Sequence, residues 1–249
     1  MDLSVISLLK KSWMCLNLAD GFSHAEMGSS TVLKTQNKVF VWTEEEIENA
    51  LFVRKTRETY RFALVYWYID ERAKSQTLLK SCSAQAPYPV PEMVCRLDSI
   101  TSITLNPDIT IKRVENENDL SIWCEIASQG RIQKQVDQTR AFASPLLKQC
   151  GDDCMLYLGY FKGKPLSTSL VILDGDIVGL FFVNTHIEAR RLGLGEAVSY
   201  TALMDARRRG ALTAILTSTA MAEKLYKKLG FTIKRTFLEY NLSAYIRQV

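Results

Sequence analysis

The stretch NTHIEARRLGLGEAVSYTALMDARRRG, residues 184–210, joins a glycine-rich loop to the start of a helix. Gly193 and Gly195 follow a pair of arginines, and a helical pattern then runs from about Gly195 to Arg209. Gly210 comes directly after three cationic residues, as is typical of a helix C-terminus. The unpaired N–H groups of a helix N-terminus favour negative charge, and glycine lets a phosphate approach them. The stretch therefore predicts an anion-binding loop.

Three kinds of phosphate loop compete for this stretch. A Walker loop is excluded because no lysine followed by serine or threonine comes after the glycines. A dinucleotide-binding fingerprint would need a glycine or alanine where Val198 stands, and its strand would not belong to a meander. The pattern R-x-x-G-x-G, from Arg190 to Gly195, fits better. A tight turn without a ligand remains the alternative interpretation of the two glycines.

The segments on either side of the loop predict a mixed α/β domain. The turn sequences KGKP and DGD separate three apolar, β-branched and aromatic runs, which is typical of an antiparallel meander. Ser218 or Thr219 is predicted to cap the last helix, and Gly230 to end it. The predicted order is strand 109–114, helix 116–128, helix 132–149, strands 155–161, 166–173 and 177–185, the helix of the quoted stretch, strand 211–217, helix 218–230 and strand 231–242.

The first part of the chain has no glycine-rich loop between a strand and a helix. A segment of small polar residues that ends near Pro107 indicates a boundary, so we expect one domain over residues 1–107 and a second over residues 108–249. Thr43 and Glu46 form a predicted capping box. The predicted elements of the first domain are strand 37–42, helix 43–60, strand 61–69 and helix 72–83.

The loop and a later segment, LYKKLGF (residues 225–231), together resemble the GNAT superfamily of acyl-CoA-dependent N-acetyltransferases. The resemblance covers residues 109 to about 245 and implies an α/β (α+β) fold, with a mixed, mostly antiparallel central sheet flanked by helices. The segment LLKSCSAQAPYPVPEMVCRL (residues 78–97) resembles the end of a degenerate GNAT-like half that is fused ahead of some members. Because this half lacks the loop, it should not bind the coenzyme, and we expect it to cover the acceptor cleft or a sheet edge.

The resemblance implies that acetyl-CoA is the co-substrate and assigns residues to it. The strand before the loop would pair with the pantetheine arm, and the loop amides would hold the pyrophosphate. Ser218 or Thr219 stands where the family commonly has asparagine, and Ile187 stands where it commonly has proline. The implied coenzyme-binding residues are Val183, Asn184, Thr185, Arg190, Arg191, Leu192, Gly193, Leu194, Gly195, Glu196 and Ser218.

Tyr226 matches the family tyrosine that protonates the departing sulfur, and its alternative role is that of a packing residue on an amphipathic helix. A neutral amine would attack the thioester directly in a ternary complex, so no covalent enzyme intermediate is needed. Glu188, His186 and Glu125 are all conceivable bases, and family members often use water instead. We therefore expect an N-acetyltransferase acting on a primary amine. The alternative is a non-catalytic module that binds or senses acyl-CoA.

The amino-acid composition limits the kinds of partner that the chain is expected to bind. The net charge is +4 and the charges are dispersed, so nucleic acid is not the expected partner. The six cysteines show no C-x-x-C spacing and the chain has two histidines, so a metal site is not expected; the pair in CGDDC is interpreted as ordinary thiols beside a loop. No apolar run approaches the ~20 residues of a membrane span, and the N-terminus is a poor signal peptide. We expect a cytoplasmic protein that acts on an amine-bearing small molecule or protein.

Overall fold

The computed structural model describes residues 23–27, 30–35, 38–43, 47, 53, 56, 58–59, 64–83, 85–129 and 133–242. The helix expected over residues 43–60, with its capping box, lies for the most part outside these residues, as does the N-terminal segment with Cys15. In the described ranges, no helix combines the length and the apolar character needed to cross a membrane.

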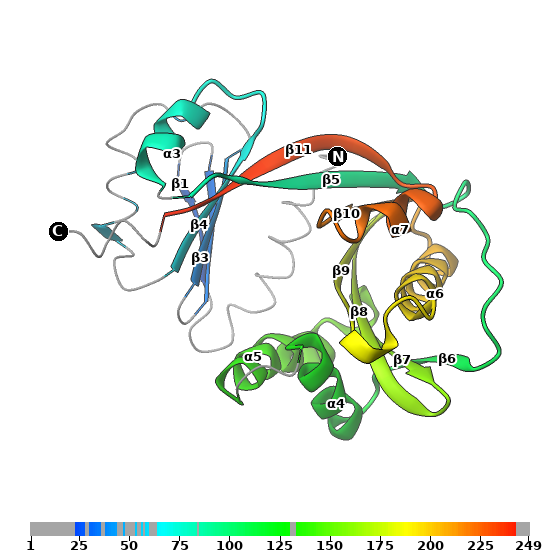
Figure 1. Ribbon diagram of the computed structural model, residues 1–249. Helices are drawn as coiled ribbons and strands as arrows, with labels where there is room; N and C mark the ends of the chain where they lie inside the picture. Colours follow the sequence, from blue (N-terminus) through cyan, green and yellow to red (C-terminus); the bar gives the residue numbers. More distant parts are fainter. Residues whose placement is uncertain are drawn as a thin grey trace.

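One sheet of eleven strands forms the centre of the described structure, in the order β1-β2-β3-β4-β11-β5-β10-β9-β8-β7-β6 (Figure 1). The pairs β3–β4 and β9–β10 are parallel and the other pairs are antiparallel, which confirms the predicted mixed, mostly antiparallel sheet. The strands are β1 (Ser23–Met27), β2 (Ser30–Lys34), β3 (Lys38–Thr43), β4 (Leu64–Asp70), β5 (Tyr88–Arg96), β6 (Ile109–Arg113), β7 (Cys154–Phe161), β8 (Lys164–Asp174), β9 (Ile177–Thr185), β10 (Thr213–Thr217) and β11 (Thr232–Asn241).

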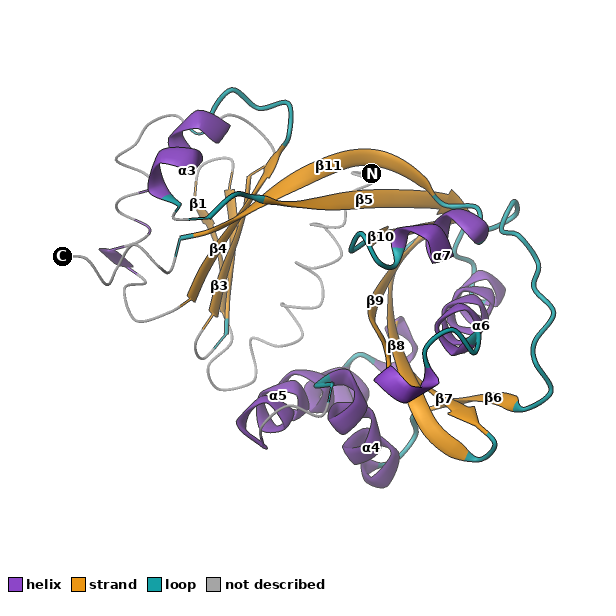
Figure 2. Ribbon diagram, in the orientation of Figure 1, coloured by secondary structure: helices purple, strands orange, loops and turns teal. Residues whose placement is uncertain are grey.

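The helices of the second half cover both faces of the sheet (Figure 2). One hydrophobic cluster packs α6 and α7 against one face of β7 to β10, and a second cluster packs α4 and α5 against the other face. Asn116 caps α4, because its side chain accepts a hydrogen bond from the Asp119 N–H. The helices are α3 (Gln76–Cys82), α4 (Glu117–Ala127), α5 (Gln133–Gln149), α6 (Leu194–Arg208) and α7 (Glu223–Lys228), with short 3₁₀ turns η1 (Gly151–Asp153) and η2 (Ile187–Ala189).

The last helix is shorter than the sequence predicts, and Ser218, one of its two predicted caps, does not cap it. Helix α7 starts at Glu223, and the residue before it, Ala222, provides no side-chain cap. Ser218 does not start a helix because its N–H donates to the Pro91 carbonyl at 2.8 Å, which prolongs the pairing of β10 with β5. The Thr219 hydroxyl accepts a hydrogen bond from the Ala222 N–H at 3.4 Å, within the turn that precedes α7.

Strands β5 and β11 join the two halves of the chain into one sheet. Strand β5 lies between β10 and β11, and β11 lies between β4 and β5, so both strands run from one half into the other (Figure 1). The domain boundary predicted near residue 107 falls in the loop between β5 and β6. Strand β5, which precedes this loop in the sequence, therefore hydrogen-bonds to β10 and β11, which follow the loop.

A buried ion pair holds this junction together. Glu92 on β5 is completely buried, and the Nε and Nη2 atoms of Arg235 on β11 lie 3.3 and 3.2 Å from its Oε2. A shift in register between Ile233 and Arg235 also brings the Lys234 Nζ to 3.4 Å from the Glu92 Oε1. The Arg235 guanidinium lies over the Phe237 ring, 4.6 Å from its centroid. A buried carboxylate is tolerated only when it is paired in this way.

Replacing Arg235 with leucine should lower the free energy of unfolding by about 3–5 kcal/mol, because Glu92 would stay buried with a weakened counter-charge. The double variant Glu92→Leu/Arg235→Leu should recover much of that loss, since both charges are then removed. Urea denaturation followed by circular dichroism measures both effects. As a control, Arg96→Leu breaks the exposed Arg96–Asp98 pair at the end of the same strand and should barely change the midpoint. Equal losses in the single and double variants would contradict this account of the junction.

Candidate active site

Strands β9 and β10 pair for a short distance and then separate. The last pair is Gly179 with Ile215, after which β9 continues to Thr185 without a strand on that side. Strand β10 instead stays paired with β5 up to Thr217, which lies opposite Glu92. The predicted site residues Val183, Asn184 and Thr185 therefore lie on an open strand edge, called here the open edge of β9 (residues 180–185).

A β-bulge distorts β9 at this edge. Its register against β8 shifts between Thr168 and Leu170, and Phe182 adopts a φ of 49°, which is uncommon for a residue other than glycine. The Thr168 hydroxyl donates to the Phe182 carbonyl at 2.9 Å. The run IVGLFFVNT carries no glycine or proline at the bulge that would reveal it, so sequence reasoning missed this feature.

The loop between η2 and α6 presents a row of unpaired amides. Among the described residues, no carbonyl or side chain accepts a hydrogen bond from the backbone N–H of any residue from Arg191 to Glu196. Three of these amides belong to the first turn of α6, where the helix dipole adds positive partial charge. The side chains of Arg190 and Arg191 are exposed and have no carboxylate partner within the described structure. The loop can therefore hold an anion on amides and balance its charge with two arginines.

Backbone conformation explains the glycine at position 193, and close packing explains the glycine at position 195. Gly193 is the N-cap residue of α6 and has a φ of 88°, which glycine adopts without strain. A Cβ at Gly195 would lie 3.3 Å from the Leu225 Cδ1 and 3.4 Å from the Thr185 Oγ1. The first turn of α6 is thus packed closely against both α7 and the end of β9. This contact brings the amide loop, the open edge and α7 together at one place.

An ion pair also connects the start of α6 to α7. The Glu196 carboxylate lies 2.7 Å from the Lys228 Nζ through one oxygen and 2.9 Å through the other. The negative charge of Glu196 is therefore neutralised, and its presence in the first turn does not prevent an anion from approaching the amides. Leu194, by contrast, is buried and belongs to the core, while Leu192 is exposed.

Tyr226 faces the interior from α7. Its side chain is 5% exposed, and its ring meets that of Phe231 edge to face with centroids 5.8 Å apart. Burial raises the pKa of the Tyr226 hydroxyl above its usual range, so the phenol stays protonated at neutral pH. No hydrogen-bond partner for this hydroxyl is found in the described part of the chain. Unlike the Tyr240 hydroxyl, the Tyr226 hydroxyl oxygen is not fully buried, so it can be reached from outside the core.

The other predicted residues have varied surroundings. Ser218 is buried, and its hydroxyl donates to the Thr219 carbonyl at 2.9 Å. Asn184 accepts a hydrogen bond from the Gln129 Nε2 at 2.7 Å, and the Thr185 hydroxyl lies 3.0 Å from that of Ser167.

The three conceivable bases lie at the surface. Glu125 is exposed on α4, and the Glu188 carboxylate, itself exposed, lies 3.8 Å from the His186 Nδ1. Cys150 and Cys154 flank η1, and Cys154 is buried. Within the described residues, no three histidine, cysteine or acidic side chains are placed to hold a metal ion.

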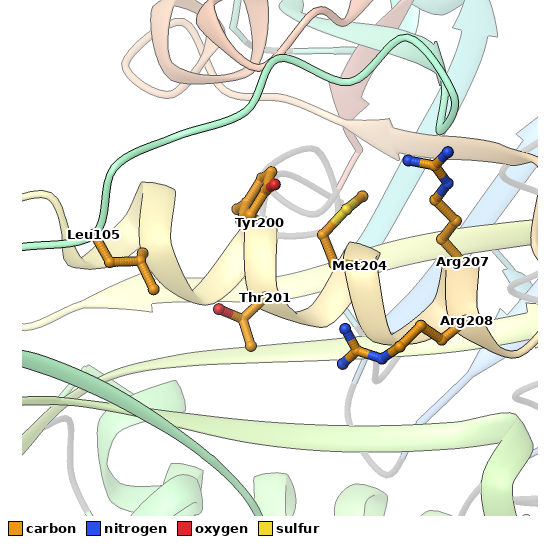
Figure 3. A pocket seen from close by; sticks show the side chains of 6 residues that line it. All are labelled: Leu105, Tyr200, Thr201, Met204, Arg207 and Arg208. Carbon is orange, nitrogen blue, oxygen red and sulfur yellow. The ribbon is translucent and has the colours of Figure 1, made fainter.

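A shallow hollow runs along α6, away from the amide loop (Figure 3). None of the predicted site residues lines it, and it lies towards the other end of the helix. Its lining residues are Leu105, Tyr200, Thr201, Met204, Arg207 and Arg208.

The structure is similar to solved structures along most of its length. It matches a GCN5-related N-acetyltransferase from Kribbella flavida with a TM-score of 0.69 and 18% identity over 96% of each chain. A GCN5-related N-acetyltransferase from Sphaerobacter thermophilus matches with a TM-score of 0.67 and 14% identity over 97% of this chain and 86% of that one. A tandem GNAT protein from the clavulanic acid biosynthesis pathway matches with a TM-score of 0.60 and 8% identity over 92% and 86% of the two chains.

No protein-family model matches the sequence, and a sequence search of curated proteins finds no match. The likeness is therefore one of fold, and it extends over both halves of a tandem protein. The chain has the GNAT fold, as the R-x-x-G-x-G loop and the LYKKLGF segment predicted for residues 109 to about 245, and the likeness to a tandem protein agrees with the GNAT-like first half predicted from residues 78–97.

Proposed function

We propose that the chain is an N-acetyltransferase that moves an acetyl group from acetyl-CoA to a primary amine by direct attack in a ternary complex. The observation that carries this proposal is the row of unpaired amides from Arg191 to Glu196, packed beside the open edge of β9. The acceptor is an amine-bearing small molecule or protein. The described cysteines form no disulfide with one another, which supports a reducing, cytoplasmic setting.

The surroundings of the loop fit the coenzyme. Its pyrophosphate is an anion that six consecutive amides can bind, and Arg190 and Arg191 would balance its charge. The backbone groups of Val183 to Thr185 that face away from β8 would bind the amide groups of the pantetheine arm, much as a neighbouring strand would. The buried hydroxyl of Ser218 lies just beyond the end of β10 and would contact the same arm.

Bound acetyl-CoA would supply an activated acetyl thioester. The acceptor nitrogen forms the new bond to the acetyl carbon and loses a proton to solvent, while the carbon–sulfur bond breaks. Tyr226 would give its proton to the departing sulfur and later regain one from solvent. Burial raises its pKa, which keeps the phenol protonated but makes it a weaker acid than an exposed tyrosine, so the transfer would depend on the basicity of the departing thiolate.

Acetyl-CoA should raise the melting temperature of the parent chain, because a ligand that binds the native state stabilises it. In Gly195→Glu the shift should vanish, since the added side chain and its charge lie against the loop amides. Gly195→Ala adds only a Cβ, so its loss of melting temperature measures the cost of the 3.3 Å contact with Leu225 without an added charge. Differential scanning fluorimetry measures all of these shifts.

The matched control is Gly210→Glu at the other end of α6. Gly210 has a φ of 101°, and no atom lies within 4 Å of a Cβ added there, so this variant introduces the same charge away from the loop. It should lose some stability but keep the full acetyl-CoA shift. A folded Gly195→Glu chain that retains the shift would remove the loop from coenzyme binding.

Tyr226→Phe should reduce kcat by roughly 10² or more while acetyl-CoA affinity stays unchanged, as expected for a positioned acid. Because no internal hydrogen bond of this hydroxyl is lost, the stability of the variant should not fall. Tyr240→Phe is the control: Tyr240 also has an unpartnered hydroxyl, but that hydroxyl is fully buried and belongs to the core of the first half.

Release of free thiol with a panel of amines gives kcat, and titration calorimetry gives the affinity. Full turnover in Tyr226→Phe would exclude the acid role. Binding of acetyl-CoA without turnover of any amine by the parent would favour the alternative, a non-catalytic acyl-CoA-binding or sensing module.

A further inference from the structure

The bulge in β9 places two neighbouring phenylalanines on the same side of the sheet. Phe181 packs against the hydrophobic cluster of α4 and α5, and the Phe182 ring lies 5.5 Å from that of Trp123 and 5.1 Å from that of Phe142. In a regular strand, successive side chains would point to opposite faces. The rings of Phe181, Phe182, Trp123 and Phe142 form what is called here the aromatic wall.

Phe182 is exposed and strained at the same time. Its ring is 37% exposed although it contacts two other aromatic rings, and its backbone has a φ of 49°. A strained conformation persists where the surroundings enforce it, and such residues concentrate at ligand sites. The residue that follows, Val183, belongs to the open edge of β9, so the exposed ring lies one residue from the proposed path of the pantetheine arm.

The polar groups around the aromatic wall are bound within the protein. The Trp123 indole N–H donates to the Ser169 carbonyl at 3.1 Å, and the Thr168 hydroxyl donates to the Phe182 carbonyl. At the far end of β9, the Gln129 Nε2 donates one hydrogen bond to the Asn184 Oδ1 and so joins the segment after α4 to the strand. Trp123 and Phe142 are buried, so the flat apolar surface that the wall presents is that of Phe182, with the partly buried Phe181 beside it in the chain.

We propose that the aromatic wall binds the acceptor, and that the acceptor is a primary amine attached to a flat apolar group. This inference rests on the proposed function, because it takes the acceptor to reach the thioester from the α4–α5 side while the coenzyme lies on the α6–α7 side. An aromatic substituent would stack on or meet the edge of the Phe182 ring. A small polar substituent would make no such contact with the ring.

The test compares 2-phenylethylamine with ethanolamine, two primary amines that differ in the apolar ring. The full chain should acetylate 2-phenylethylamine with a kcat/KM at least roughly tenfold higher. Phe182→Ala should abolish this preference by raising KM for 2-phenylethylamine, so that kcat/KM falls much more for 2-phenylethylamine than for ethanolamine. Phe182→Tyr, which keeps the ring, should retain the preference.

Leu212→Ala is the matched control, because Leu212 is 53% exposed and lies just before β10, at the end away from the open edge. It should behave as the parent with both amines. Equal kcat/KM values for the two amines in the parent, or an equal fall for both in Phe182→Ala, would overturn the inference.

Calorimetric titration of 2-phenylethylamine into the CoA-loaded chain tests the wall independently of turnover. If 2-phenylethylamine binds the parent chain and binds Phe182→Ala more weakly, the aromatic wall is supported. This holds even if the parent transfers no acetyl group, because that failure would refute only the proposed function. Absence of binding to the parent would refute the wall, whatever the acetyl-CoA shift shows.

Discussion

The separation of β9 from β10 is the constraint on which the rest of the site depends. Strand β10 pairs with β9 from Thr213 to Ile215 only, whereas it pairs with β5 along its whole length. Because β5 extends towards the first half, β10 follows it away from β9. The buried pair of Glu92 and Arg235 fixes the sheet where β10 ends, so an interaction between the halves stabilises the opening in the second half.

The opening divides the site between two faces of the sheet. On one face, the contact of Gly195 with Leu225 and Thr185 sets the amide loop against the open edge, and α7 brings Tyr226 into the same core. On the other face, the bulge directs Phe182 towards Trp123 and Phe142. Coenzyme and acceptor would thus approach one gap from opposite sides, which is the geometry that direct transfer requires.

Local patterns predicted most elements, because alternation, turn residues and caps act over short distances. The meander, the Asn116 cap and the end of α6 at Gly210, whose φ is 101°, follow from neighbouring residues. Long-range contacts were not predictable: Glu92 and Arg235 are 143 residues apart, and nothing local places β5 between β10 and β11. The glycine pattern located the loop, yet the packing reason for Gly195 and the bulge at Phe182 needed the structure.

The most direct test of the account is a crystal structure of the chain with acetyl-CoA. The account predicts one coenzyme per chain, with pyrophosphate oxygens within hydrogen-bonding distance of the amides between Arg191 and Glu196, and with the pantetheine arm along Val183 to Thr185. The thioester would then lie at the gap between β9 and β10. A coenzyme bound elsewhere, for example in the hollow along α6 beside Arg207, or a second coenzyme in the first half, would contradict it.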